Sequence, residues 1–352
     1  MNILYYITSH GFGHAVRTAA ICNEIDKKIS ITIRSGVSNE FFVEEIDRAF
    51  KYSYGEFDCG CVQKDGVTVD MQKTLEKYNQ IAKNNKTILT EEIAFVKNGN
   101  FNLIISDSVP FAFEVAKCSG IKSIAVGNFS WVDIYEPYTK KYPKYKEMIN
   151  EIATQYSLAT YLFRLEPSNE MTSFTGMEYS FPVVTSKGRA DVVSLKKRYV
   201  ISGDKKLAAI YIGNFGLEGV NWSRLKEFSE WEFFGVYRIN SSPSNFHLID
   251  KSFMKYRDVI ASMDIVIGKI GYGTYCESVA NNRQLIYLPR DNFSEHSILE
   301  KSLIEKGLAI KLSEVDFKNM DIRFALKQLK LNNVKYEKLN GAKKIAKAIE
   351  NI

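Results

Sequence analysis

Short apolar runs of strand length recur along the chain, and each is followed by turn residues and a segment with helical spacing. The runs form two series. The first comprises residues 3–7, 29–33, 103–105 and 121–126, and the second comprises residues 207–212, 233–237, 265–267 and 285–288. Strands that alternate with helices in this way form parallel sheets with helices on both faces. The pattern therefore predicts an α/β protein with two doubly wound, Rossmann-like domains.

The length of the chain agrees with two domains. At 352 residues, it exceeds the size at which one hydrophobic core usually stops growing. We expect the linker in FPVVTSKGRADVV, residues 181–193, where the first series has ended and the second has not begun. The expected domains are residues 1–182 and 191–335. Residues 336–352 should form a terminal helix that could pack back on the first domain, because its apolar residues have helical spacing.

The composition is that of a globular protein without a membrane span. Hydrophobic residues make up 45% of the chain and charged residues 25%. The net charge of +6 is small for this length and the basic residues are scattered, so an anionic ligand is favoured but nucleic acid is not required. No apolar stretch approaches the roughly 20 residues that span a bilayer, and the first run is too short for a signal peptide. We expect a cytoplasmic protein with no transmembrane segment.

The cysteines do not have the spacing of a metal site. Their number, five, is odd, and Cys59 and Cys61 form a lone C-x-C pair. An incidental pair in a loop is a better interpretation than a metal site, and a reduced compartment fits this usage. We therefore expect no bound metal.

The stretch TSHGFGHAVR, residues 8–17, follows the first apolar run and precedes a helical segment. In open parallel sheets, ligands bind at such strand-to-helix loops. Gly11 and Gly13 permit a close approach of the backbone, while His10 and His14 bring the side chain best suited to proton transfer near neutral pH. A plain glycine turn with one capping histidine explains the stretch equally well when it is taken alone.

A second glycine-rich loop, VIGKIGYGTYCES, spans residues 266–278. Backbone amides at the start of the helix that we expect from Thr274 could hold a diphosphate, Lys269 could add a positive charge, and Glu277 could accept hydrogen bonds from ribose hydroxyls. The loop is neither a P-loop nor the dinucleotide fingerprint. The alternative is a structural glycine turn.

Three further loops carry candidate ligand contacts. LPRDNFSEHSILEK, residues 288–301, gathers polar groups suited to a hydroxyl-rich ligand. YIGNFGLEG, residues 211–219, has two glycines around Asn214 and could line the interdomain cleft. Asp107, at a predicted strand end, could contact a ligand or cap the next helix. Trp131 could stack on a sugar or a base, or lie in the core.

Together these motifs resemble the GT-B glycosyltransferases. The likeness is to the glycosyltransferase-like N-terminal domain of plant L-arabinokinases and, more remotely, to the N-acetylglucosaminyltransferase that makes lipid II. It runs through YYITSHGFGHAVR, ISDSVPFAFEVAKCSGIKSIAVGNFSWVDIYEPY, GKIGYGTYCES and LPRDNFSEHSILEK. The kinase activity of the plant proteins belongs to a separate sugar-kinase domain, so we do not expect it here.

The resemblance implies an acceptor bound by the first domain, a nucleotide-sugar donor bound by the second, and a reaction in the cleft that the domains face. His14 matches the histidine that often acts as base, and His10 is the second candidate. The implied donor contacts are Gly213, Asn214, Gly271, Tyr272, Gly273, Thr274, Glu277, Glu295 and His296. The acceptor-side candidates are Gly11, Phe12, Gly13, Arg17, Asp107 and Trp131, with Arg17 either anchoring the turn or meeting an anionic substrate. Glu295 and His296 stand where glutamine or Asp-Gln is common, which leaves the donor sugar open.

The function expected from the resemblance is transfer of a hexosyl or pentosyl group from a nucleoside-diphosphate sugar, taken to be uridine-linked, without a metal or cofactor. The acceptor could be a small molecule, a glycan or a nucleic acid. A nucleotide-sugar hydrolase or epimerase on the same fold is an alternative, as is a protein that binds nucleotide sugars without turnover.

Overall fold

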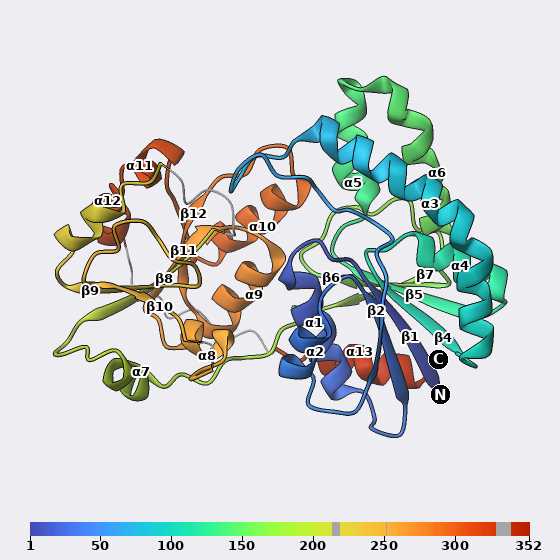
Figure 1. Cartoon of the computed structure of the whole chain (residues 1–352), viewed down its shortest axis with the longest axis horizontal. Helices are drawn as coiled ribbons and strands as arrows, with labels where there is room; N and C mark the ends of the chain where they lie inside the picture. The colour runs from blue at the N-terminus through green and yellow to red at the C-terminus, as the bar shows by residue number, and fades with distance from the viewer. Residues whose placement is uncertain (213–218, 251, 329–338) are drawn as a thin grey trace. The chain divides into compact units, whose positions relative to one another are not determined.

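The computed structural model describes residues 1–212, 219–250, 252–328 and 339–352, and the chain forms two compact units (Figure 1). The first unit contains residues 1–62, 69–185 and 340–352, and the second contains residues 63–68 and 186–339. Each unit has one parallel sheet, so the predicted α/β class is confirmed. Residues 63–68, which we expected in the first domain, belong to the second unit because Val67 packs against its core.

The first unit is built on a seven-stranded parallel sheet with the order β3-β2-β1-β4-β5-β6-β7. Its strands are β1 (Asn2–Ile7), β2 (Ser30–Ser35), β3 (Lys51–Tyr54), β4 (Leu103–Asp107), β5 (Lys122–Gly127), β6 (Tyr161–Leu165) and β7 (Met177–Phe181). The chain order reverses between β1 and β4. Parallel sheets of this kind bind ligands beyond the carboxyl ends of the strands at such a reversal.

Helices cover both faces of this sheet (Figure 1). They are α1 (Phe12–Glu24), α2 (Asn39–Glu45), α3 (Met71–Asn98), α4 (Phe111–Ser119), α5 (Trp131–Tyr135), α6 (Lys146–Ser157) and α13 (Gly341–Glu350), with 3-10 turns η1 (Glu136–Lys140) and η2 (Pro143–Tyr145). Leu4, Tyr6 and Ile104 of the sheet pack against Val96 of α3 and Val115 of α4 in one buried cluster.

The last helix, α13, returns to the first unit and packs against α1 (Figure 1). It buries Ile345, Ala346 and Ile349. At its start, Gly341 lies so close to the chain that a Cβ would come within 2.4 Å of the carbonyl oxygens of Pro182 and Val183. A residue with a side chain would therefore force this junction apart.

The second unit has a six-stranded parallel sheet with the order β10-β9-β8-β11-β12-β13. The strands are β8 (Lys206–Tyr211), β9 (Trp231–Gly235), β10 (Phe246–Leu248), β11 (Ile265–Lys269), β12 (Gln284–Leu288) and β13 (Ala309–Lys311). The helices are α7 (Val192–Arg198), η3 (Trp222–Glu227), α8 (Tyr256–Ala261), α9 (Tyr272–Asn281), α10 (Ser294–Glu305), α11 (Glu314–Lys318) and α12 (Arg323–Lys327).

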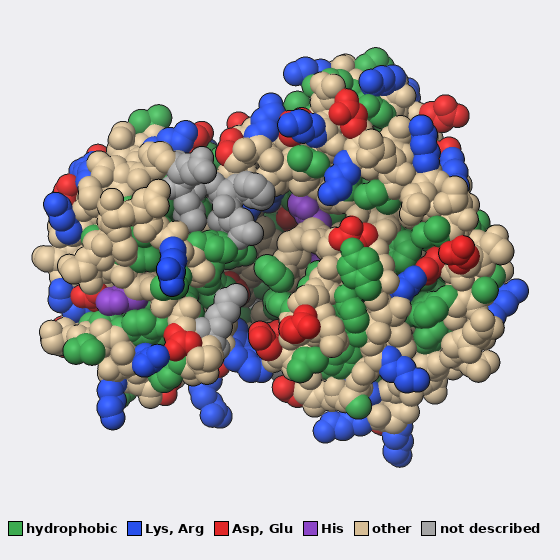
Figure 2. Space-filling model, in the orientation of Figure 1, with side chains coloured by type: hydrophobic (Ala, Val, Ile, Leu, Met, Phe, Trp, Pro, Cys, Tyr) green, Lys and Arg blue, Asp and Glu red, His purple; other side chains and the backbone are tan. Residues whose placement is uncertain are grey.

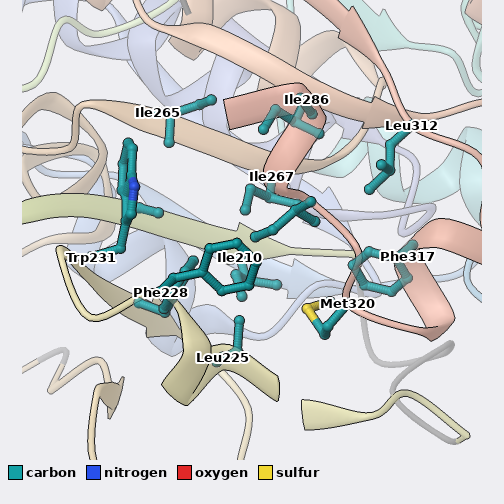
Figure 3. Close-up of a cluster of buried hydrophobic side chains, with 14 of the residues drawn as sticks. Ile210, Leu225, Phe228, Trp231, Ile265, Ile267, Ile286, Leu312, Phe317 and Met320 are labelled. Atoms are coloured by element: carbon teal, nitrogen blue, oxygen red, sulfur yellow. The ribbon is translucent and has the colours of Figure 1, made fainter. Parts of the chain in front are cut away.

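The central strands of this sheet are apolar because both of their faces are covered. Figure 3 shows side chains of Ile210 from β8, Ile267 from β11 and Ile286 from β12 in one cluster with Phe317 and Met320. This core fixes the strands whose carboxyl ends carry the glycine-rich loops.

Candidate active site

The glycine-histidine turn lies between β1 and α1 in the first unit. Gly11 has φ +79°, a conformation that favours glycine, and α1 begins at Phe12 without a side-chain hydrogen bond to its free amides. The turn is therefore not a histidine cap. Ile7 of β1 is paired with Asp107 of β4, so the turn and Asp107 lie at the point where the strand order reverses.

His14 and Asp107 form a buried pair at this point. The Nδ1 atom of His14 lies 2.7 Å from Oδ1 of Asp107, and the two residues are 7% and 0% exposed. Nη2 of Arg17 also lies 3.0 Å from this Nδ1 atom, but it donates to Oδ1 of Asp107 over a shorter distance of 2.6 Å. An ionised carboxylate only accepts hydrogen bonds, so the shorter contact to Asp107 favours a proton on Nδ1 and leaves Nε2 of a neutral ring as a proton acceptor. The contact orients the ring so that Nε2 can accept a proton.

Arg17 anchors Asp107 and is itself buried. Its Nε and Nη2 atoms donate to the two carboxylate oxygens, each over 2.6 Å, and Nη1 donates to Oδ1 of Asn128 over 2.8 Å. Burial raises the pKa of Asp107, but Arg17 and His14 outweigh it and hold the pKa at about 2. Of the two roles that the sequence left open for Arg17, the structure favours the anchor.

Asp107 does not cap the following helix. The residue before α4 is Pro110, which makes no side-chain capping bond, and the carboxylate of Asp107 faces His14 and Arg17 instead. The carboxylate therefore orients the histidine. Sequence reasoning did not find this pairing, because the two residues are 93 positions apart.

His10 is also held at its Nδ1 atom, but there the partner is a hydrogen-bond donor. The backbone amide of Cys61 donates to its Nδ1 atom over 3.1 Å, and Gly60, with φ +56°, lies directly against the ring. A Cβ on Gly60 would come within 2.1 Å of the imidazole. The ring is half-buried, and its centroid is 6.5 Å from that of His14.

The expectation that Trp131 offers its ring to a sugar or a base needs correction. Trp131 is 0% exposed, and its ring stacks on Tyr135 with 5.3 Å between the ring centroids. Its indole N–H donates to Oδ2 of Asp58 over 2.8 Å, and its edge packs against His10. Trp131 thus forms the wall behind His10 and has no open face.

Asp58 is a residue of this site that sequence reasoning missed. Its carboxylate accepts hydrogen bonds from Thr8 Oγ1 over 2.6 Å and from Trp131. Burial raises the pKa of Asp58 to about 7, the two hydrogen bonds lower it, and the negative charge of Asp107 adds to the increase. The sequence feature that could have pointed to Asp58 is the long polar loop between β3 and α3, in which FDCGC places an acidic residue among small ones.

Phe12 and the two glycines lie at the surface of the turn. Phe12 is 51% exposed and stacks on Phe41, with 5.1 Å between the ring centroids. Gly11 is exposed and Gly13 is half-buried. Phe12 and Gly11 are therefore accessible to solvent, and Gly13 is partly accessible.

In the second unit, the loop after β11 leads directly into α9. Gly271 precedes the helix, which begins at Tyr272, two residues before the expected start at Thr274, and a Cβ on Gly271 would meet nothing within 4 Å. The first turn, which includes Gly273, has no side-chain capping bond. Backbone amides at the start of a helix can bind an anion.

Two basic residues lie near this helix start. Lys269 is the last residue of β11, and Arg290 follows the neighbouring strand β12. Burial lowers the pKa of Lys269 to about 8; the charge of Arg290 lowers it further and that of Asp65 acts in the opposite direction. The guanidinium of Arg290 lies 4.2 Å from the centroid of the Phe293 ring. The positive charge at this position favours an anionic ligand.

The predicted donor contacts Glu277, Glu295 and His296 belong to the same region. Glu277 of α9 lies near the phenols of Tyr211 and Tyr256, whose pKa values rise mainly through burial and further through its charge. Glu295 and His296, in the first turn of α10, are 4% and 5% exposed.

The ring of His296 is buried, and its Nε2 atom lies 3.5 Å from the backbone nitrogen of Arg290 and 4.0 Å from Oε1 of Glu300. Burial lowers its pKa, and its Nδ1 atom makes no hydrogen bond within the described part of the chain. Gly213 and Asn214, which we also expected to contact the donor, lie outside the described residues.

Two negative findings apply to residues 1–212, 219–250, 252–328 and 339–352. Within these ranges no group of three or more His, Cys, Asp or Glu side chains is placed to hold a metal ion. No helix there has the length and apolar character needed to cross a bilayer. On the face drawn in Figure 2, Lys and Arg side chains are interspersed with acidic and neutral ones.

The chain is similar in sequence to one curated protein, the L-arabinokinase of Arabidopsis thaliana. The two are 31% identical over 308 residues, which are 85% of this chain and 29% of that protein. The chain thus spans less than a third of its relative's length. No protein-family model matches the chain.

Solved structures share the fold over almost the whole chain. CalG4, the calicheamicin glycosyltransferase, matches with a TM-score of 0.65 and 14% identity over 99% of this chain and 97% of its own. UGT2 of Phytolacca americana, solved with UDP-2-fluoro-glucose and pterostilbene, matches with a TM-score of 0.63 and 13% identity over 99% and 93%. MurG of Acinetobacter baumannii has a TM-score of 0.60 and 12% identity over 100% and 99%.

A further solved structure that shares this fold is named as an enzyme of a different activity. It is a putative UDP-N-acetylglucosamine 2-epimerase from Listeria monocytogenes, with a TM-score of 0.59 and 12% identity over 99% of this chain and 96% of its own. The expected fold is confirmed: the chain has the two-domain GT-B fold of glycosyltransferases.

Proposed function

We propose that the chain is a glycosyltransferase that moves a sugar from a nucleoside-diphosphate donor, uridine-linked as in the UGT2 complex, to a hydroxyl group of an acceptor. The observation that carries this proposal is the buried His14–Asp107 pair at the strand-order reversal of a GT-B fold. A fold alone does not define an activity, whereas an oriented base at its ligand-binding edge indicates proton transfer.

In the first unit, Nε2 of His14 takes the proton from the acceptor hydroxyl as its oxygen bonds to the anomeric carbon of the donor sugar. The bond from that carbon to the diphosphate oxygen breaks, and the diphosphate leaves with the electron pair. Asp107 stabilises the imidazolium that forms, because its carboxylate accepts the Nδ1 proton. Arg17 keeps Asp107 ionised and oriented.

In the second unit, the residues after β11 and β12 hold the donor. The amides at the start of α9, from Gly271 to Thr274, bind the diphosphate together with Lys269. These groups stabilise the charge that develops on the leaving diphosphate, a task for which other transferases use a metal ion. Glu277 binds the ribose, and Glu295 with His296 contacts the sugar.

The experiment that tests this proposal measures donor binding and turnover separately. Calorimetry with a panel of nucleotide sugars should find at least one that binds, and mass spectrometry with candidate acceptors should find the product. His14→Gln should bind the donor as tightly as the natural protein and turn over about 10³-fold more slowly, since a general base contributes roughly 10²–10⁴ in rate. His247→Gln is the control, because that histidine pairs with Glu232 in the second unit and lies outside the proposed donor site. Absence of donor binding, or full activity of His14→Gln, would refute the proposal.

A second candidate function is isomerisation or hydrolysis of the nucleotide sugar. It is favoured by the epimerase that shares the fold. Steady conversion of the donor without any acceptor would support it and exclude transfer as the main reaction.

A further inference from the structure

The two histidines of the turn differ in the group that lies nearest to Nδ1: a carboxylate for His14 and a backbone amide for His10. Nδ1 of His14 lies 2.7 Å from the carboxylate of Asp107, which can only accept, and 3.0 Å from Nη2 of Arg17, which is already directed at that carboxylate over 2.6 Å. Nδ1 of His10 faces the backbone amide of Cys61, which can only donate. A neutral His14 therefore carries its proton on Nδ1, and a neutral His10 carries it on Nε2.

The amide that defines the state of His10 belongs to a firmly held segment. We call residues 57–61 the tether loop. Its Phe57 carbonyl accepts from Nδ2 of Asn85 over 2.9 Å, and its Gly60 carbonyl accepts from the hydroxyl of Tyr135 over 2.6 Å. Asp58 bridges Thr8 and Trp131. With these contacts on either side, the Cys61 amide has little freedom to turn away from His10.

The ring of His10 is equally restricted. Gly60 covers its Cγ and Nδ1 atoms closely enough to exclude any Cβ, and Trp131 packs edge-on with 5.4 Å between the ring centroids. A proton on Nδ1 would place two donors against each other and leave a buried amide without an acceptor, which is unfavourable. The surroundings thus select the Nε2–H form of the neutral ring.

We propose that His10 is a positioning residue with a fixed Nε2–H tautomer, which donates a hydrogen bond to the acceptor substrate while His14 receives the proton. This inference rests on the proposed transferase function. It replaces the earlier expectation that His10 is a second base. It also defines a class of acceptor substrate, namely molecules with a second oxygen near the reacting hydroxyl, such as a sugar or another polyol. The second oxygen can accept the hydrogen bond from His10 while the reacting hydroxyl gives its proton to His14, since the two ring centroids are 6.5 Å apart.

The tautomers can be read without any substrate. Long-range proton–nitrogen NMR of protein labelled at the imidazole nitrogens should show four histidines at pH 7. Substituting His14, His247 and His296 one at a time by Gln assigns the signals while His10 keeps its native partners. We expect Nε2–H for His10 and Nδ1–H for His14. A His10 that is charged, or that carries its proton on Nδ1, would overturn the assignment.

Two substitutions test the role of His10, because Gln and Asn carry their side-chain amides at different distances from the backbone. The side-chain amide of Gln lies near the position of Nε2, and that of Asn lies near Nδ1. His10→Gln should keep the KM for the acceptor within about threefold, whereas His10→Asn should raise it about tenfold, the value of one lost hydrogen bond, with a smaller change in kcat. Both variants should keep the acid limb of the kcat/KM profile, because His14 is the base. Loss of that limb in His10→Asn would show that His10 is a base after all.

The two proposals can fail separately. If no nucleotide sugar supports turnover, the transferase proposal fails, and with it the role of His10 toward an acceptor. The NMR measurement still decides whether the tether loop holds His10 as the Nε2–H tautomer.

Discussion

Asp58 and Asp107 are buried carboxylates of one site whose pKa values are displaced in opposite directions. Asp107 is paired with Arg17 and has a pKa of about 2. Within the described residues, Asp58 accepts from the neutral donors Thr8 and Trp131, and burial raises its pKa to about 7. The difference arises from the cation beside one carboxylate, because both residues are almost fully buried.

Asp58→Asn should therefore change how stability depends on pH. The folded pKa of Asp58 lies above its ordinary value of 3.8, so this group contributes less stability as the pH rises from about 4 to 7 and least above 7. Between pH 5 and 8 the natural protein should lose roughly 2–3 kcal/mol that the Asn variant does not lose. Chemical denaturation of both proteins at the two pH values measures the difference. A difference that stays constant with pH would contradict a raised pKa at Asp58.

At the scale of the elements, function is carried by the loops at the strand ends. The tether loop and the β1–α1 turn are 50 residues apart in sequence, yet Thr8 contacts Asp58 and Cys61 contacts His10. The contact between the two loops requires glycine at position 60, where φ is positive and the His10 ring occupies the space of a Cβ.

Gly60→Ala should destabilise the protein by more than the positive φ at position 60 alone would cause, because the new Cβ would also displace the His10 ring. A matched control is Gly120→Ala, because Gly120 also has positive φ, at the end of α4, but its Cβ would meet nothing within 4 Å. The control should lose about 1 kcal/mol of unfolding free energy, and Gly60→Ala should lose clearly more and change the His10 imidazole signals. Equal losses of unfolding free energy in the two variants, with unchanged His10 signals, would mean that the tether loop adjusts its position without moving the ring.

Lys269 should make nucleotide binding depend on pH. Its pKa of about 8 leaves it charged at pH 7, and the charge is lost as the pH rises through 8. The affinity for a nucleoside diphosphate should therefore fall over that range, and Lys269→Met should bind about tenfold more weakly at pH 7 and lose this dependence. Calorimetry measures both effects, with the exposed Lys226→Met as the control. An unchanged affinity in Lys269→Met would remove the lysine from the donor site.

At the scale of the whole molecule, the chain leaves the first unit after residue 185 and returns to it at residue 340. The returning helix α13 packs on α1, which carries His14 and Arg17. The first unit is thus completed only when the end of the chain is in place.

Ile345→Ala should destabilise the first unit without affecting the second. Ile345 is 0% exposed, and removing a buried isoleucine side chain usually costs about 2–5 kcal/mol. Denaturant unfolding should show this loss while the affinity for a nucleotide sugar stays unchanged. Ile304→Ala on α10 is the control, because that side chain is 56% exposed and its loss should cost under about 0.5 kcal/mol. A parallel loss of donor affinity in Ile345→Ala would show that the units are not independent.

The strands that sequence reasoning found and those it missed differ in burial. The eight apolar runs all lie in or beside strands of the two sheets, since a parallel strand covered on both faces must be apolar. The polar strands β3 and β7 lie at the edges of the first sheet, and the short strands β10 and β13 lie at the edges of the second. Edge strands are partly exposed, so they carry no continuous apolar run. The internal strand β6 was also missed, because Arg164 interrupts its apolar pattern.

The sequence by itself determined the fold class, the two parallel sheets and the glycine-histidine turn, because apolar periodicity and glycine spacing act over a few residues. Only the tertiary structure decided what the turn's side chains do. It brought Asp107 to His14 and Cys61 to His10, it buried Trp131, and it placed Arg17 on Asp107. These contacts join residues that lie far apart in the chain, and the proton positions on the two histidines depend on which atom each ring meets in the folded molecule.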